Sequence, residues 1–225
     1  CILYTMLILC PFVAGKVVKT FLFLSSVCLL YFVGARTEFF LACAIIPLFF
    51  YINYGFKVVI GMLVVSVMVT PFAFMAFEVN DRFSSTVSEL LSGGARNELL
   101  KKGVQGIIDS PFAGDYLGQI RDYGTPGAYI HNALSMYQQY GFIAFIIYMY
   151  LNVVAVIVAL GYISYAKNYV QLEILVYTSI TSFIGVILAK SIGWPLPAFA
   201  WGMCCLVLVC MARVVRSRRE EMSRE

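Results

Sequence analysis

The chain has 225 residues, of which 61% are hydrophobic and only 12% are charged, and its formal net charge is +4. An ordinary soluble domain carries about a quarter charged residues, so a mean hydropathy of +0.87 excludes that class and indicates a membrane protein. The positive excess lies in one C-terminal tail, which is not the pattern of a nucleic-acid-binding surface.

Seven apolar runs predict membrane helices, since about 20 apolar residues cross a bilayer core of about 30 Å. In chain order the runs are Cys1 to Ala14, Val17 to Val33, Phe39 to Tyr54, Val58 to Phe77, Phe142 to Tyr165, Val170 to Leu188, and Trp194 to Met211. The first run lacks an initiator Met, a charged n-region and a cleavage site, so we expect it to be the rest of a membrane helix in a longer protein. The sequence therefore predicts an all-α integral membrane protein, with four helices in residues 1–77 and three in residues 132–212.

Basic residues in the short connections set the expected orientation of these helices. The basic tail, residues 213–225, is expected to be cytoplasmic. When the helices alternate across the membrane, four lysines of the short connections fall on that same side: Lys16, Lys19, Lys57 and Lys167. The alternation places Arg36, Lys190 and the polar interval, residues 78–131, on the outer side.

The polar interval is expected to form an outer loop that contains one helix. From Ala95 to Asp109 apolar residues recur at helical spacing, after Gly93-Gly94 and before Ser110-Pro111. The expected apolar face comprises Leu99, Leu100, Val104, Ile107 and Ile108, so the helix is amphipathic and should lie on the membrane surface or on the helix bundle. The chain that follows, as far as Gly127, is expected to be irregular and rich in turns.

The cysteines and the single histidine give no sign of a metal site. All seven cysteines fall inside apolar runs, where a free Cys behaves as a small hydrophobe. No spacing typical of metal ligands is present. The sequence therefore predicts neither a metal nor a cofactor.

Three side chains carry candidate chemistry, and each has an ordinary alternative. Arg96 lies in the first turn of the expected loop helix, which is unfavourable unless an anion binds there or Glu98 compensates. Arg36 lies at the outer membrane edge, where it either faces a cavity or a partner such as Glu38, or extends to the interface. His131 is either a surface or capping residue or a proton carrier near neutral pH. Together these groups suit a lipid-linked phosphate or pyrophosphate, because guanidinium groups match phosphate oxygens.

Five segments, in this order, resemble the bacterial O-antigen polymerase and O-antigen ligase superfamily. They are Gly34-Ala-Arg36-Thr, Gly94-Ala-Arg96, Ile108-Asp-Ser-Pro111-Phe-Ala-Gly114, His131-Asn132, and Tyr140-Gly141. The resemblance covers roughly Leu30 to the end of the chain. The interval from His131 to Gly141 is one residue shorter than the commonest family pattern, and Asp115-Tyr-Leu-Gly118 replaces a tighter glycine repeat.

The resemblance implies a metal-independent glycosyl transfer on the periplasmic face of the bacterial inner membrane. The donor would be a glycan on undecaprenyl pyrophosphate, whose anomeric carbon is attacked by an acceptor sugar hydroxyl. Arg36 and Arg96 would hold the pyrophosphate, and His131 would orient or deprotonate the acceptor. Residues that would bind the glycan or fix the loop are Asn132, Arg121, Asp115, Asp122 and Tyr123. Lys190 is a further substrate-binding candidate, or a plain interfacial residue.

Several functions stay open at this point. In a polymerase the acceptor is another lipid-linked repeat, whereas in a ligase it is lipid A–core. A lipid-linked glycan transporter or flippase would need charged or broken helices at mid-membrane, and the apolar runs are nearly free of charge apart from Glu173. A structural membrane subunit without a site is the last alternative. The expected partners are the lipid-linked glycan, the acceptor glycan, the lipid bilayer and a chain-length regulator, with no nucleic acid.

Overall fold

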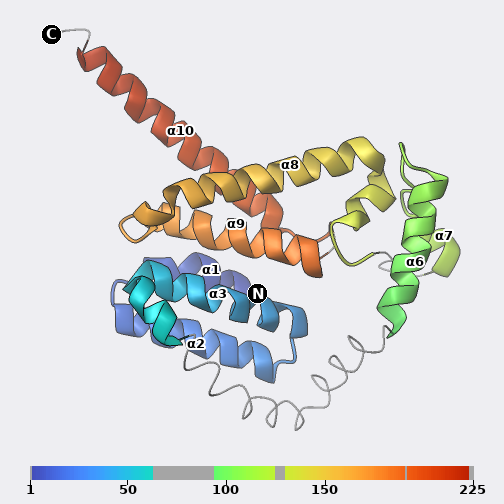
Figure 1. Cartoon of the computed structure of the whole chain (residues 1–225), viewed down its shortest axis with the longest axis horizontal. Coiled ribbons are helices and arrows are strands. Elements are labelled where there is room, and N and C mark those ends of the chain that lie inside the picture. Colours follow the sequence, from blue (N-terminus) through green and yellow to red (C-terminus); the bar gives the residue numbers. More distant parts are fainter. Residues whose placement is uncertain (1, 63–93, 125–129, 191, 223–225) are drawn as a thin grey trace.

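The computed structural model describes residues 2–62, 94–124, 130–190 and 192–222, and within these ranges the regular elements are all helical (Figure 1). They are α1 (Ile2–Leu9), the 3₁₀ helix η1 (Cys10–Phe12), α2 (Lys16–Phe32), α3 (Arg36–Tyr54), α6 (Gly94–Asp109), α7 (Gly118–Tyr123), α8 (Leu134–Ala166), α9 (Val170–Leu188) and α10 (Leu196–Met222). Residues 56–62 are helical as well. The predicted all-α class is therefore confirmed for the described residues.

Four of the described helices are long and apolar enough to cross a membrane. They are α3, α8, α9 and the Leu196–Arg213 part of α10. These four helices indicate a multi-pass membrane protein. The predicted count of seven spans is matched only in part: α2 has 17 residues and α1 with η1 covers only Ile2–Phe12. Most of the predicted run from Val58 to Phe77 lies outside the described residues.

The predicted boundaries hold for some helices and are wrong for others. α9 begins and ends where the sequence predicted, at Val170 and Leu188. The first apolar run does not form one helix, because Pro11 lacks the N–H that would continue α1 and the chain tightens into η1. α8 begins at Leu134 rather than Phe142, and α10 continues to Met222 through residues predicted to form the tail.

α9 is the centre of the bundle and packs against α1, α3, α8 and α10. Figure 1 shows it between α8 on one side and the α1–α3 group on the other. Its apolar window is 61% buried, against 22–28% for the other three candidate spans. The chain can therefore place polar side chains on α9 away from lipid, including Thr178, Thr181 and Ser182.

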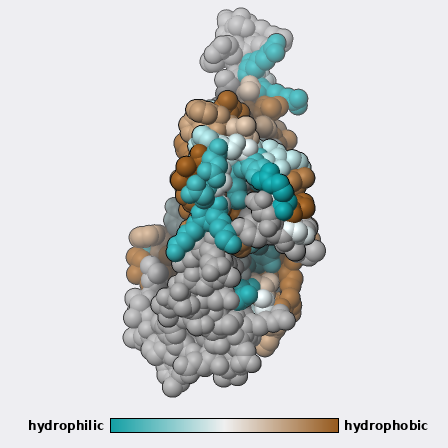
Figure 2. Space-filling view, turned by 90° about the vertical axis from the view of Figure 1, so that its right-hand side faces the viewer, coloured by the Kyte–Doolittle hydropathy of each residue, from teal (hydrophilic) through white to brown (hydrophobic). Residues whose placement is uncertain are grey.

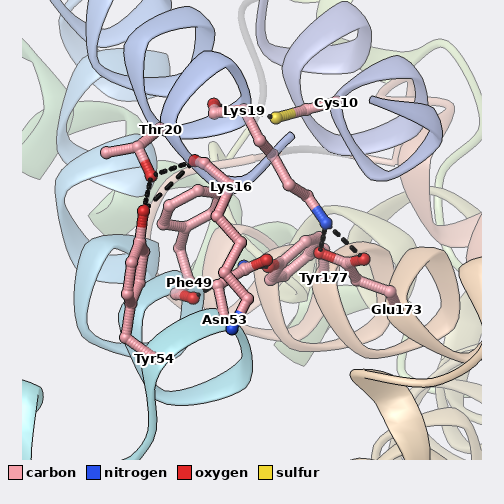
Figure 3. Close-up of polar contacts among 9 residues, drawn as sticks. All are labelled: Cys10, Lys16, Lys19, Thr20, Phe49, Asn53, Tyr54, Glu173 and Tyr177. Atoms are coloured by element: carbon pink, nitrogen blue, oxygen red, sulfur yellow. Dashed lines mark hydrogen bonds and ion pairs between the residues drawn. The ribbon is translucent and has the colours of Figure 1, made fainter. Parts of the chain in front are cut away.

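A buried ion pair fixes the position of α2 against α9 (Figure 3). Both carboxylate oxygens of Glu173 lie 2.6 Å from Lys19 Nζ, and the two side chains are only 5% and 8% exposed. Beside the pair, Asn53 Nδ2 donates to the Tyr177 hydroxyl at 3.1 Å, which ties α3 to α9 as well. We call this end of the bundle, which carries Lys16, Lys19, Lys57 and Lys167, the lysine end.

Candidate functional site

The opposite end of the bundle, which we call the α6 end, is where α3 and α8 begin, α9 ends, and α6 and α7 lie (Figure 1). Two contacts join its segments. Lys190 Nζ donates to Glu38 Oε1 at 3.0 Å and links the chain after α9 to the first turn of α3. The Ile192 N–H donates to Ser135 Oγ at 2.9 Å and links the same chain to the start of α8. The predicted site residues therefore come from segments that meet at one end.

The main chain of residues 110–115 docks onto the first turns of α8. The Asp115 N–H donates to the Gln138 carbonyl at 2.8 Å, and the Phe142 N–H donates to the Pro111 carbonyl at 3.2 Å. These bonds connect segments far apart in the sequence, and they satisfy backbone groups that α8 leaves open where it bends at Gly141.

Two glycines make this close approach possible. Gly114 has φ +70° and Gly141 has φ +79°, a region that L-residues with a side chain rarely adopt. A Cβ on Gly114 would lie 2.5 Å from the Gly141 nitrogen, and a Cβ on Gly141 would run into the Phe112 carbonyl. The Pro-x-x-Gly stretch and the Tyr-Gly pair singled out in the sequence are therefore in direct backbone contact.

α6 confirms the predicted loop helix and packs on the bundle at the start of α8. Its buried residue is Gly103, where a Cβ would collide with the Ile130 side chain. Of the predicted apolar face, Leu100, Val104 and Ile108 are exposed in the structure, whereas Leu99 and Ile107 are half-buried. The absence of a side chain at Gly103 allows the closest approach, so this residue, rather than the larger apolar ones, defines the packed face.

A pocket of about 490 Å³ lies between α6, residues 110–115 and α7. It is lined by Lys102, Gln105, Gly106, Asp109, Ser110, Gly114, Asp115 and Arg121. Among the lining residues that the structure describes, two cations and two carboxylates balance each other. Figure 2 turns this end of the molecule towards the viewer and shows hydrophilic residues gathered on it. The pocket is within the usual size range of small-ligand sites, roughly 300–1,000 Å³.

Arg121 and Asp115 form the most ordered polar contact of this pocket. Arg121 Nη2 lies 2.6 Å from Asp115 Oδ2 and Nη1 lies 3.5 Å from Oδ1, so the guanidinium faces both oxygens. A Cβ on Gly118 would collide with the Asp115 carboxylate. Glycine at this position thus lets Asp115 lie over the first turn of α7, a helix that the sequence interpretation had taken for irregular chain.

Four other predicted residues with described side chains are not among those that line this pocket. Arg36 begins α3 and is half-buried, whereas His131 is exposed and precedes α8. Asn132 Oδ1 accepts the Leu134 N–H at 2.9 Å, as the side chain of an Asx turn does, just before the Ala133 N-cap of α8. Lys190 pairs with Glu38 and lies 5.4 Å from the centroid of the Trp194 ring.

For Arg96, Asp122 and Tyr123 the side chains lie outside the described residues. The backbone places Arg96 in the first turn of α6, as predicted, and the other two residues at the end of α7.

Sequence reasoning missed three residues that line the pocket: Lys102, Gln105 and Asp109. All three lie on one face of α6, and Gln105 Nε2 donates to Asp109 Oδ1 at 2.9 Å. Their spacing of three and four residues could have identified them in the sequence, since this spacing places their polar groups together on the helix face away from the packed one. Within the described ranges, no three His, Cys, Asp or Glu side chains gather as a metal-binding group would.

The fold and this site define a multi-pass helical membrane protein with a polar pocket at one end of its helices. Comparisons of the chain with protein-family models, with curated proteins and with solved structures give no match.

Proposed function

We propose that the protein is a polysaccharide repeat-unit polymerase of the O-antigen type. It would move a glycan from undecaprenyl pyrophosphate to a sugar hydroxyl of a second lipid-linked repeat, on the periplasmic side of the membrane. The docking of residues 110–115 onto the bend at Gly141 supports this function most directly. Two of the five segments that carry the family resemblance, Ile108 to Gly114 and Tyr140-Gly141, touch each other there. Neither their order in the sequence nor their hydropathy requires this contact.

The proposed reaction exchanges one C–O bond for another. The acceptor hydroxyl oxygen bonds to the anomeric carbon, the bond from that carbon to the pyrophosphate breaks, and its electron pair leaves with the pyrophosphate. The acceptor proton passes to His131, which is exposed at the α6 end. Arg36 and Arg96 neutralise the charge that develops on the leaving pyrophosphate.

The balanced charge of the described residues that line the α6-end pocket supports a role in binding the sugars rather than the pyrophosphate. Lys102 and Arg121 are matched by Asp109 and Asp115, so a dianion gains little there. The carboxylates, the guanidinium and the amide of Gln105 instead offer the directed hydrogen bonds that sugar hydroxyls need. Residues at the start of α3 and α6 then take the pyrophosphate nearer the membrane helices.

The test uses a strain that lacks the gene, complemented with the full-length protein. Arg36→Ala, Arg96→Ala and His131→Ala are each expected to abolish long glycan chains while single repeats still reach the core. Lys101→Ala is the matched control, because Lys101 is an exposed cation of α6 that does not line the pocket.

Three results would change this proposal. Normal ladders from all three variants at normal protein levels would overturn the site. Unattached lipid-linked chains of full length in the gene-deletion strain would assign the ligase reaction instead. Loss of activity when a chelator is added to the purified enzyme would contradict metal-independent transfer.

A further inference from the structure

A second pocket of about 490 Å³ lies at the lysine end, on the far side of the membrane helices from the first. It is formed by the start of α2, the end of α3 and the end of α8. Its polar lining comprises Lys16, Tyr51, Asn53, Tyr54, Ser164 and Lys167. The glycosyl transfer proposed above uses none of these residues.

The two lysines of this pocket have no carboxylate partner in the part of the chain that the structure describes. None of the described residues that line the pocket is an Asp or a Glu. The nearby acid, Glu173, is already neutralised by Lys19 in the buried pair (Figure 3). The pocket therefore keeps two positive charges that nothing on its walls offsets.

The Lys16 ammonium group is held in place by Tyr54. Lys16 Nζ lies 5.7 Å from the centroid of the Tyr54 ring, a cation–π distance. The ring is fixed in turn, since the Tyr54 hydroxyl donates to the Lys16 carbonyl at 3.1 Å and bonds Thr20 Oγ1 at 2.7 Å. A positioned cation loses less side-chain freedom on binding an anion than a mobile one does.

Helix dipoles do not cancel this positive charge. Near the pocket, η1, α3 and α8 end at the lysine end, whereas α2, residues 56–62 and α9 begin there. α10 also ends on this side, but none of its residues lines the pocket. Each helix end contributes about half a charge, positive where a helix begins and negative where it ends. The three pairs largely offset each other, so the lysine charges decide the local potential.

Exposed apolar side chains beside the pocket distinguish a lipid from a soluble anion. Val17 is 80% exposed, Phe56 65% and Tyr165 56%. Phe56 lines the pocket itself, and the other two residues adjoin Lys16 and Ser164 in the sequence. The pocket also lies at the ends of membrane-crossing helices, where phospholipid phosphates are found.

We propose that this pocket binds the phosphate headgroup of an anionic phospholipid, with Lys16 and Lys167 as its ligands and the Ser164 hydroxyl as a hydrogen-bond donor beside them. The lipid's acyl chains would then run along the apolar surface beside Val17 and Phe56. This site is independent of the glycan pocket and does not rest on the proposed glycosyl transfer.

The experiment measures thermal unfolding of the delipidated full-length protein in detergent. The added probes are phosphatidylglycerol, phosphatidylcholine with the same acyl chains, and inorganic phosphate. The test variant combines Lys16→Gln with Lys167→Gln. The control variant combines Lys57→Gln with Lys101→Gln; it removes the same charge, and neither of its residues lines this pocket.

Phosphatidylglycerol is expected to raise the unfolding temperature of the unaltered protein and of the control at similar concentrations. The test variant should need a concentration roughly tenfold higher or more, since it lacks both lysines that attract the anionic headgroup. Phosphatidylcholine and inorganic phosphate should have little effect.

Three results would overturn the proposal. An equal loss in the control would indicate attraction to surface charge in general. An equal effect of phosphatidylcholine would indicate acyl-chain binding alone, and an equal effect of inorganic phosphate would indicate a site for soluble anions. Native mass spectrometry gives a second measurement that does not depend on stability: equal retention of phosphatidylglycerol by the test variant and the control would also refute the site.

Discussion

The α6 end and the lysine end of this bundle are held together by different parts of the chain. At the α6 end, hydrogen bonds between main-chain groups join residues 110–115 to the first turns of α8. The N–H groups of Asp115 and Phe142 donate to carbonyls of the other segment, and Gly114 and Gly141 allow the two segments to touch. At the lysine end regular helices meet through side chains, above all the buried pair of Lys19 and Glu173. The packing of the α6 end should therefore be sensitive to added side-chain atoms, whereas the packing of the lysine end should be sensitive to altered charge.

The largest expected effect tests the lysine end. Lys19→Met leaves the Glu173 carboxylate buried and unpaired, so we expect a loss of about 3–5 kcal/mol in the free energy of unfolding. The double change of Lys19→Met with Glu173→Leu should recover most of that loss, because it removes both charges. Unfolding in mixed detergent micelles measures each value.

Lys57→Met is the control for that experiment, because Lys57 is an exposed lysine at the same end. It should change stability by less than about 0.5 kcal/mol. A small effect of Lys19→Met, similar to that of the control, would show that charge does not hold the lysine end.

The next effect tests the α6 end. Gly141→Ala forces a side chain into a positive-φ conformation and against the Phe112 carbonyl, so we expect a loss of about 2 kcal/mol or more. The proposed polymerase activity should fall together with the stability, because residues 110–115 lose their contact with α8 at Gly141. Unfolding and glycan chain length are both measured.

Gly161→Ala in the same helix is the matched control. Nothing lies within 4 Å of a Cβ at Gly161, and alanine in a helix interior is favoured over glycine by about 1 kcal/mol. The control should therefore be neutral or slightly stabilising. If both substitutions behave alike, backbone contact at Gly141 is not what shapes the α6 end.

A smaller effect separates two roles of Asn132. Asn132→Ala removes the acceptor of the Leu134 N–H and should cost about 1 kcal/mol. Asn132→Asp keeps an acceptor and should restore stability. If the Asp variant is stable but inactive in the glycan assay, the amide N–H of Asn132 contacts substrate; if it is stable and active, the Asx turn accounts for the residue.

The smallest stability effect concerns the Arg121–Asp115 pair. Arg121 is 68% exposed, and ion pairs at the surface contribute about 0–1 kcal/mol, so Arg121→Ala should hardly alter unfolding. Glycan chain length should nevertheless shorten, because a hydrogen-bond donor leaves the proposed sugar pocket. A variant with normal chains would remove Arg121 from the proposed site.

The contrast between the two ends also explains how much the sequence could reveal. The run from Val170 to Leu188 was predicted correctly because polar residues bound an apolar stretch. Arg121 and Asp115, both named as glycan-binding candidates, line the same pocket, but their binding role stays a prediction. The early start of α8 was missed, since a glycine at position 141 and polar first turns suggest a loop until residues 110–115 dock there.

Other features depend on partners that local sequence does not specify. Lys19 and Glu173 are 154 residues apart, so periodicity gives no sign of their pairing. α7 has six residues with glycine at its start and just past its end, too short for a periodic signal. Its position depends on the contact between Asp115 and Gly118, which only the folded chain brings about.

The bend at Gly141 also sets the position of residues 110–115 along α8. α8 has 33 residues, so a straight helix of that length would measure about 50 Å, well beyond a bilayer core of about 30 Å. The bend divides it where the apolar run begins, and residues 110–115 are bonded to that same point. The bend thereby fixes residues 110–115, which line part of the proposed sugar pocket, at the start of the apolar part of α8. In the proposed function the substrate is anchored by its own lipid, so its reactive carbon lies one pyrophosphate away from the membrane. α8 would then set the distance between the membrane and the pocket, in addition to crossing the membrane.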